Sequence, residues 1–171
     1  MMEANWLQTL LERVESGETS VGEALDRLRG FPYEDIGFAR MDSHRSLRKG
    51  FPEVIFCPGK TTEQIVEIVG RTRAREGKVL AARAAPDVAE AVQRDFPDAV
   101  YHAAARMIQV GEATPRSGRG TVLVVSAGTA DIPVADEAVV TATMMGSSVE
   151  RLYDVGVAGI HRLFGNHEQL F

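Results

Sequence analysis

The chain has 171 residues with a formal net charge of −5, 44% hydrophobic and 25% charged residues, a composition that is typical of folded globular proteins and excludes wholesale disorder. The acidic balance argues against general affinity for nucleic acid, and the single cysteine, Cys57, excludes an internal disulfide. No apolar run is long enough to span a bilayer, so we expect a cytoplasmic protein with neither a nucleic-acid nor a membrane partner.

Two short amphipathic helices open the chain. Apolar residues recur at helical spacing from Trp6 to Val14, and Gly17 is a natural stop. Ser20 and Glu23 match a capping box, which predicts a second helix. Helices this short need a surface to pack on. The helical hairpin is therefore either a lid on the rest of the domain or an arm that docks on a neighbouring subunit.

A charged segment follows between the apolar runs 36–38 and 54–56, where it reads as a hairpin. Arg45 and Arg48 could fork onto a phosphate or carboxylate, and Asp42 could orient one of them. Solvated charges explain these residues equally well, because exposed arginine is the default. After the second run, Cys57 is more often a small buried residue than a nucleophile.

Residues 53–110 alternate between strand and helix patterns, which predicts a small α/β domain with helices packed on a sheet. The expected elements are a helix opening at Thr61, a strand at 79–82, a helix opening at Pro86, and strands at 99–101 and 107–110. Residues 112–120, EATPRSGRG, break all periodicity. We place a linker there, between a domain of residues 1–111 and a second of residues 121–171.

Residues 121–162 read as one strand-helix-strand unit. The apolar run 121–125 predicts a parallel strand covered on both faces, and Val149–Tyr153 predicts the second strand. The helix between them is expected to run from Ile132 to Met145, with a face made of Val134, Ala138, Thr141 and Met145. Ligands collect at the carboxyl ends of parallel strands. The loops 126–131 and 154–162 are therefore the candidate site.

Several residues of the first loop could contact a ligand. Backbone N–H groups around Gly128 and Thr129 lie at a helix start, where they can donate to an anion, and Ser126 precedes them at the strand end. Asp131 could orient a ribose hydroxyl or a water, although a plain helix N-cap is its commoner role.

The second loop offers Asp154 at the strand end, Gly156 after it, and then His161 and Arg162. Asp154 can reach a ligand or merely cap the next turn. His161 could do acid–base or phosphate chemistry, although a lone histidine is more often structural. Arg162 could pair with a phosphate or form a surface salt bridge. No cluster has metal-ligand spacing, so no protein-bound metal is implied.

Four stretches together resemble the LarB family of nickel-pincer cofactor biosynthesis. They are DSHRSLRKGFPEVIFCPGKTTEQ at 42–64, ARMIQVG at 105–111, VLVVSAGTADIPVADEA at 122–138 and RLYDVGVAGIHRL at 151–163. The C-terminal half of LarB enzymes is similar to the purine-pathway aminoimidazole ribonucleotide (AIR) carboxylase. The resemblance therefore implies that residues 121–171 begin a parallel-sheet, flavodoxin-like domain of that kind.

The resemblance also implies an activity. LarB enzymes carboxylate C5 of the pyridinium ring of nicotinic acid adenine dinucleotide with CO2 and hydrolyse its phosphoanhydride, which gives pyridinium-3,5-biscarboxylic acid mononucleotide and AMP. They assemble as octamers, so a homo-oligomer is expected here. No covalent cofactor is expected, and any Mg²⁺ would arrive with the substrate phosphates.

The resemblance supports one residue role, because His161 matches the catalytic-loop histidine of AIR carboxylases. Asp131 is the second candidate catalytic residue. From their positions and charges, the candidate substrate-binding residues are Ser126, Gly128, Thr129, Asp154, Gly156 and Arg162, together with Arg45, Arg48 and Asp42 from the N-terminal domain.

The sequence departs from the family pattern in two respects. LarB enzymes continue with further strands, a glycine-rich loop and a cysteine that attacks the pyridinium ring, whereas this sequence ends at Phe171 and Cys57 does not match that cysteine. Ala130 stands where the family usually has serine. We expect a piece of the enzyme that is inactive alone. The alternatives are a purine-pathway AIR carboxylase and a non-catalytic nucleotide-binding or assembly module.

Overall fold

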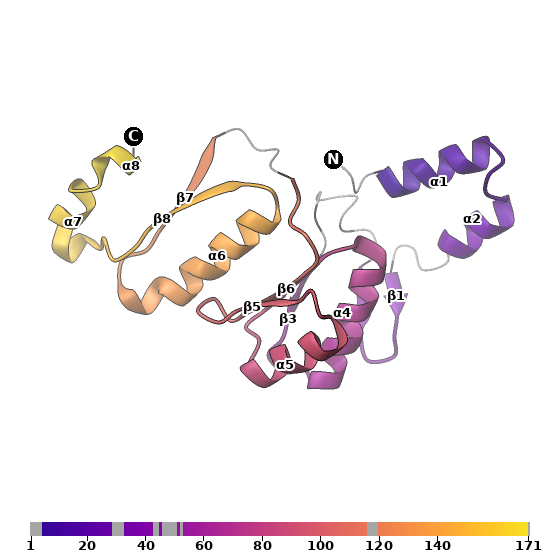
Figure 1. Cartoon of the computed structure of the whole chain (residues 1–171), viewed down its shortest axis with the longest axis horizontal. Coiled ribbons are helices and arrows are strands. Elements are labelled where there is room, and N and C mark those ends of the chain that lie inside the picture. The colour runs from indigo at the N-terminus through magenta and orange to yellow at the C-terminus, as the bar shows by residue number, and fades with distance from the viewer. Residues whose placement is uncertain are drawn as a thin grey trace. The chain divides into compact units, whose positions relative to one another are not determined.

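The computed structural model describes residues 5–28, 33–42, 45, 51, 53–115 and 120–170. The fold is mixed α/β with several small sheets (Figure 1). The chain divides into two compact units, Met1–Glu53 and Val54–Phe171, and each is described by itself.

The first unit holds helices α1 (Asn5–Glu15) and α2 (Val21–Leu28) and strands β1 (Tyr33–Asp35) and β2 (Arg40–Asp42). The predicted capping box is confirmed. The Glu23 N–H donates to Ser20 Oγ at 3.2 Å, and the Ser20 N–H donates to Glu23 Oε2 at 2.8 Å. These two bonds satisfy donors that the start of α2 would otherwise leave unpaired.

The predicted hairpin between the runs 36–38 and 54–56 is wrong, because the strands that pair lie on either side of residues 36–39. β1 pairs antiparallel with β2, so residues 36–39 form the turn and the run 36–38 is not a strand. Gly37 adopts φ +85°, and its N–H donates to Asp35 Oδ1 at 2.9 Å. A glycine in the left-handed region and an aspartate two residues before it are local turn chemistry that outweighs the apolar character of Ile36 and Phe38.

The second unit begins with a four-stranded sheet in the order β3-β4-β6-β5. Strands β3 and β4 run parallel, while β6 is antiparallel to both β4 and β5. The elements in chain order are β3 (Val54–Phe56), α4 (Thr62–Glu76), β4 (Val79–Ala82), α5 (Pro86–Asp95), β5 (Val100–His102) and β6 (Met107–Val110). The strand-helix alternation predicted for residues 53–110 is confirmed.

A hydrophobic core joins this sheet to the helix α6 (Ile132–Met144). Leu80 and Ala82 of β4 and Met107 of β6 pack with Val140 and Met144 of α6. Side chains alternate between the two faces of a strand, so Val79 and Ala81 of β4 point to the other face of the sheet. On that face α4 packs on β3, β4 and α5. The sheet is thus covered by α4 and α5 on one side and by α6 on the other (Figure 1).

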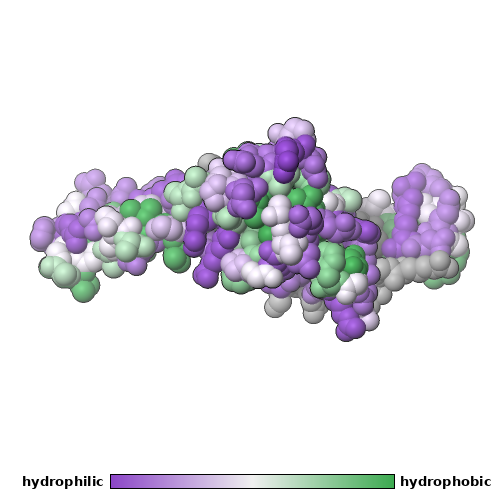
Figure 2. Space-filling view, turned by 90° about the horizontal axis from the view of Figure 1, so that it is seen from below, coloured by the Kyte–Doolittle hydropathy of each residue, from purple (hydrophilic) through white to green (hydrophobic). Residues whose placement is uncertain are grey.

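The strand-helix-strand unit is confirmed as β7 (Thr121–Val125), α6 and β8 (Ser148–Leu152), with β7 and β8 parallel over five residue pairs. The expectation that β7 is covered on both faces is wrong for the described chain. Val122 and Val125 are 45% and 47% exposed, because this sheet has two strands and the helix that packs on both of them is α6. The described surface accordingly mixes apolar with polar residues (Figure 2).

The face of α6 that carries Val134 and Ala138 is not the buried one. Val134 is 64% exposed and Ala138 is exposed, whereas the buried residues are Ala135, Val139, Val140 and Met144. The helix is apolar on most sides, so its sequence does not single out one stripe. The buried face is chosen by tertiary contacts with β4, β6, β7 and β8.

The predicted boundary at residues 112–120 stays a prediction, and residues 116–119 of it lie outside the described part of the chain. At its start, the Thr114 N–H donates to the Met144 carbonyl at 3.0 Å, which fastens the end of the four-stranded sheet domain to the end of α6.

Candidate functional site

The two predicted loops lie side by side at the carboxyl ends of β7 and β8. The Ser126 N–H donates to the Leu152 carbonyl at 3.1 Å, the Val155 N–H donates to the Ser126 carbonyl at 3.1 Å, and the Gly156 N–H donates to the Ala127 carbonyl at 2.8 Å. The parallel ladder therefore continues beyond both strands, and it brings residues 126–131 next to residues 154–156.

Gly156 is required by this close approach. A Cβ added to it would lie 2.7 Å from the Ala127 carbonyl oxygen and 3.3 Å from the Ala127 Cβ. The nearest obstacle is backbone, which cannot move aside as a flexible side chain could. The predicted site residue Gly156 is thus placed by packing between the loops.

Asp131 does not bond the helix N–H groups as an N-cap side chain would. It occupies the N-cap position of α6, but its side chain makes no bond to that helix. Instead, Asp131 Oδ2 accepts from the Gly128 N–H at 2.9 Å. The expected N-cap role of Asp131 is therefore wrong, because its carboxylate closes its own loop. The Gly128 N–H, expected to be free for an anion, is bonded within the loop and could donate to a ligand only if Asp131 moved. Thr129, between the two, is exposed.

Ser126 is a buried polar residue of the candidate site. Its side chain is 6% exposed, and its Oγ has no hydrogen-bond partner among the described residues. A buried hydroxyl without a partner costs free energy, on the order of 1–3 kcal/mol. A ligand or an ordered water that bonds this hydroxyl would remove that cost.

Asp154 and Arg162 form an ion pair across the second loop. Arg162 Nη1 lies 2.6 Å from Asp154 Oδ2, with side chains 39% and 46% exposed. Asp154 adopts φ +60°, a left-handed conformation that is uncommon for a residue with a side chain. The guanidinium also lies against Gly159, where an added Cβ would meet Arg162 Nε at 2.8 Å. The salt-bridge role weighed for Arg162 is therefore realised, and the pair is exposed enough to meet an anion.

His161 precedes Arg162 on the short helix α7 (Ile160–Phe164), which follows the turn η2 (Val157–Gly159). Its side chain is exposed. A catalytic role for His161 stays a prediction, as does that of Asp131.

The residues predicted from the N-terminal domain are placed less completely. Arg48 lies outside the described residues. Arg45 is described, and its Nε atom is buried with no hydrogen-bond partner in the part of the chain that the structure describes. Asp42 ends β2. All three belong to the first unit, so their approach to the loops of the second unit stays a prediction.

Cys57 is confirmed as a buried residue. Its side chain is 4% exposed, and burial raises the pKa of its thiol to about 11, against which Lys60 acts in the opposite direction. The nucleophilic form of cysteine is the thiolate. At neutral pH this thiol stays protonated and unreactive.

Sequence reasoning missed the residues that brace this site. The Tyr153 hydroxyl donates to Asp136 Oδ1 at 2.6 Å, and Arg151 Nε lies 3.5 Å from the same oxygen. These residues stand far apart in the chain, and no local pattern links a tyrosine at a strand end to an aspartate on a helix. The available signal was the position of Tyr153 directly before the strand-end Asp154.

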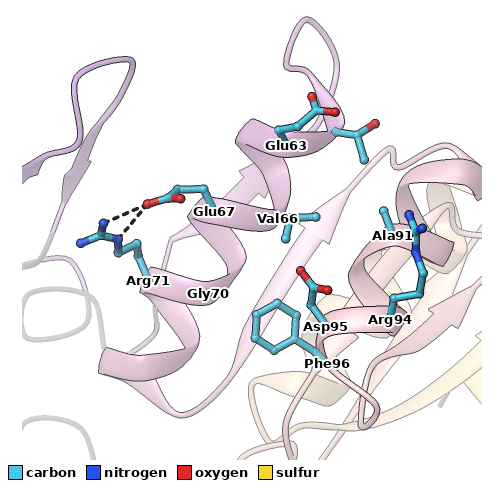
Figure 3. Close-up of a pocket in the computed structure, with 10 residues that line it drawn as sticks. Glu63, Val66, Glu67, Gly70, Arg71, Ala91, Arg94, Asp95 and Phe96 are labelled. Atoms are coloured by element: carbon cyan, nitrogen blue, oxygen red, sulfur yellow. Dashed lines mark hydrogen bonds and ion pairs between the residues drawn. The ribbon is translucent and has the colours of Figure 1, made fainter.

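An open groove lies elsewhere in the second unit, between α4 and α5, with a volume of about 680 Å³ (Figure 3). Its floor includes Val66, Gly70 and Phe96, and the Glu67–Arg71 ion pair lies on its rim. None of the predicted site residues lines it. We base the candidate site on the loops, because their polar groups converge at the carboxyl ends of two adjacent parallel strands.

The described residues show neither a metal-binding cluster nor a membrane-spanning helix. Among them, no three histidine, cysteine, aspartate or glutamate side chains come together to hold a metal ion. Within the same part of the chain, no helix is both long and apolar enough to cross a membrane.

Comparison with known proteins adds a family relationship. A family model described as the LarB/PurE-like N-terminal domain matches residues 33–112. The uncharacterized protein MJ0165 of Methanocaldococcus jannaschii is 30% identical over 165 residues, which cover 92% of this chain and 64% of that protein. The chain thus spans somewhat less than two thirds of the length of this relative.

Proposed function

Because residues 33–112 match a family model described as the LarB/PurE-like N-terminal domain, we propose that this chain serves LarB-type chemistry on nicotinic acid adenine dinucleotide. The reaction would add CO2 to C5 of the pyridinium ring and hydrolyse the phosphoanhydride, giving pyridinium-3,5-biscarboxylic acid mononucleotide and AMP. The similarity to MJ0165 extends over 92% of the chain, so it reaches well beyond residues 33–112.

The observation that carries the proposal is the meeting of the loops 126–131 and 154–162 around an unpaired buried hydroxyl. Ser126 Oγ lies at the carboxyl end of β7 without a partner among the described residues. The same loop carries the exposed Thr129. The Asp154–Arg162 pair lies on the adjoining loop. Hydroxyl groups and a guanidinium are donors that suit phosphate and carboxylate oxygens. A dinucleotide carries both kinds of anion.

The proposed roles follow from these positions. Arg162 pairs with a phosphate while Asp154 keeps its guanidinium oriented. Ser126 donates to the ligand from the strand end. His161, exposed beside Arg162, accepts or supplies a proton. Any Mg²⁺ binds together with the substrate phosphates, because the described residues offer no cluster of their own.

Carboxylation of an electron-poor ring also needs a transient nucleophilic adduct. The single cysteine of this sequence is Cys57, whose thiol is buried and protonated at neutral pH. We therefore propose that this chain binds the dinucleotide and does not turn it over by itself. The assembly in which the complete reaction runs is proposed to be a homo-oligomer.

The experiment is a binding and turnover comparison on the chain as it is. Isothermal titration is expected to show binding of nicotinic acid adenine dinucleotide and weaker binding of carboxyaminoimidazole ribonucleotide. Chromatography after incubation with bicarbonate and Mg²⁺ is expected to show no AMP. Preference for the ribonucleotide would favour a purine-pathway carboxylase, and absence of binding to either would overturn the proposal.

The matched variant for that titration is Arg162→Gln, which removes the charge and keeps a polar but shorter side chain. It is expected to weaken dinucleotide binding by roughly tenfold or more, as one charge-assisted contact predicts. Steady formation of pyridinium-3,5-biscarboxylic acid mononucleotide by the wild-type chain would show that another group replaces the thiol nucleophile. The proposal that this chain binds the dinucleotide without turning it over would then be wrong, as it would if AMP alone were released.

A further inference from the structure

Tyr153 and Asp136 connect helix α6 to the end of β8. The Tyr153 hydroxyl donates to Asp136 Oδ1 at 2.6 Å, and Arg151 approaches the same oxygen at 3.5 Å. The Asp136 side chain is 19% exposed, so the bond is partly shielded from water. Burial first, and the hydrogen bond to Asp136 second, raise the pKa of Tyr153 above its ordinary value. Its hydroxyl is therefore a protonated donor throughout the neutral range.

The residue that follows Tyr153 has an uncommon backbone conformation. Asp154 adopts φ +60°, which a residue with a Cβ keeps only when its surroundings hold it there. Its two neighbours are both fixed. Tyr153 is bonded to Asp136 through its side chain, and the buried Val155 is bonded to the Ser126 carbonyl through its N–H. The conformation of Asp154 is thus imposed from both sides.

This conformation determines where the Asp154 carboxylate lies. Asp154 Oδ2 is 2.6 Å from Arg162 Nη1, and the guanidinium lies against Gly159. An arginine on an otherwise exposed five-residue helix has many rotamers available, so the carboxylate is what fixes its orientation. A continuous series of contacts therefore runs from α6 through Tyr153 and Asp154 to Arg162.

We propose that Tyr153 is a positioning residue, whose hydrogen bond to Asp136 holds Asp154 in the conformation that orients Arg162 toward an anionic group of the ligand. The identity of that ligand rests on the proposed function, whereas the orientation of Arg162 does not. Tyr153 itself touches no reacting atom, so its effect on binding passes entirely through the Asp154–Arg162 pair.

The test uses Tyr153→Phe, which removes one hydroxyl and keeps the ring. A matched control is Tyr101→Phe, since the Tyr101 hydroxyl also makes one partly buried hydrogen bond, to the Ala84 carbonyl at 3.1 Å, away from the loops. The first measurement is the Nε–H resonance of Arg162 in protein labelled with 15N-arginine and free of ligand, assigned with Arg162→Lys. The second is the dissociation constant of nicotinic acid adenine dinucleotide.

Tyr153→Phe is expected to move the Arg162 resonance toward its position in Asp154→Ala and to weaken dinucleotide binding by roughly threefold to tenfold. Tyr101→Phe is expected to leave both unchanged. Asp136→Ala removes the acceptor instead of the donor and is expected to move the same resonance. An unmoved resonance in folded Tyr153→Phe overturns the inference. A moved resonance in a protein that binds no dinucleotide supports the positioning role and overturns the proposed ligand.

Discussion

The Gly156 N–H donates to the Ala127 carbonyl at 2.8 Å, and this bond joins the two loops that follow β7 and β8. The same oxygen would lie 2.7 Å from a Cβ on Gly156. Each loop thus depends on the other for its position, and the space between them admits glycine alone without a shift of backbone. The candidate site is a product of this contact, because the contact sets the spacing between Ser126 on one loop and the Asp154–Arg162 pair on the other.

Gly156→Ala is therefore expected to force the loops apart. Overpacking against backbone predicts a loss of about 1–3 kcal/mol in the free energy of unfolding, measured by urea denaturation. Gly128→Ala is the control, since an added Cβ there lies 3.8 Å from Asp131 Oδ2, and φ is −136°, which any residue adopts. A stability for Gly156→Ala equal to that of Gly128→Ala would show that the loops do not pack this closely.

Removing the unpaired hydroxyl of Ser126 separates a structural role from a binding role. Because Ser126 Oγ has no partner among the described residues, Ser126→Ala is expected to leave the free energy of unfolding unchanged or raise it by up to about 1 kcal/mol. Dinucleotide binding is expected to weaken. If the melting temperature falls by several degrees, the hydroxyl has a partner in the native protein and is a structural residue.

Asp131 is expected to act first as a loop-closing acceptor. Asp131→Asn keeps a carbonyl oxygen for the Gly128 N–H, while Asp131→Ala removes it. Thermal unfolding is expected to show a lower melting temperature for Asp131→Ala than for Asp131→Asn. Equal melting temperatures would indicate that the bond contributes nothing to the fold, which would leave the carboxylate free for the ligand.

The raised pKa of Cys57 gives the protein a dependence on alkaline pH. With a folded pKa of about 11 against an ordinary value of 9.0, the unfolded chain releases this proton first. The stability from the buried neutral thiol is therefore complete below pH 9 and is lost as the pH rises toward 11. Cys57→Ala has no thiol to ionise, so its melting temperature does not depend on this proton. Between pH 9 and 11 the melting temperature of the wild type is expected to fall relative to that of Cys57→Ala.

A thiol assay checks the same burial at neutral pH. Reaction of Cys57 with a disulfide reagent is expected to be slow in native protein and fast in urea, because the thiolate is scarce and the side chain is 4% exposed. Rapid reaction of the native thiol would contradict both the burial of Cys57 and its exclusion from nucleophilic chemistry at neutral pH.

Local signals in the sequence predicted much of the fold. The capping box at Ser20, the strand at 79–82 and the parallel pairing of β7 with β8 follow from short-range chemistry and periodicity, and the structure confirms them. The site was located from the same signals, because the carboxyl ends of adjacent parallel strands meet.

Tertiary contacts account for what the sequence could not predict. The helix α6 packs on strands of two sheets, and because it is apolar on most sides its sequence has no single stripe that indicates the buried face. The roles of Asp131 and Tyr153 also escaped prediction. Each depends on where a side chain meets a partner in three dimensions, Gly128 N–H in one case and Asp136 in the other.

The most direct test of the account is a map of the ligand on the protein. Uniformly 15N-labelled chain is titrated with nicotinic acid adenine dinucleotide, and amide shifts are followed by heteronuclear NMR. The largest shifts are expected at Gly128, Thr129 and Gly156, and the amides of Gly70 and Ala91 in the groove are expected not to move. Largest shifts in the groove between α4 and α5, or none at the two loops at saturating ligand, would contradict the account.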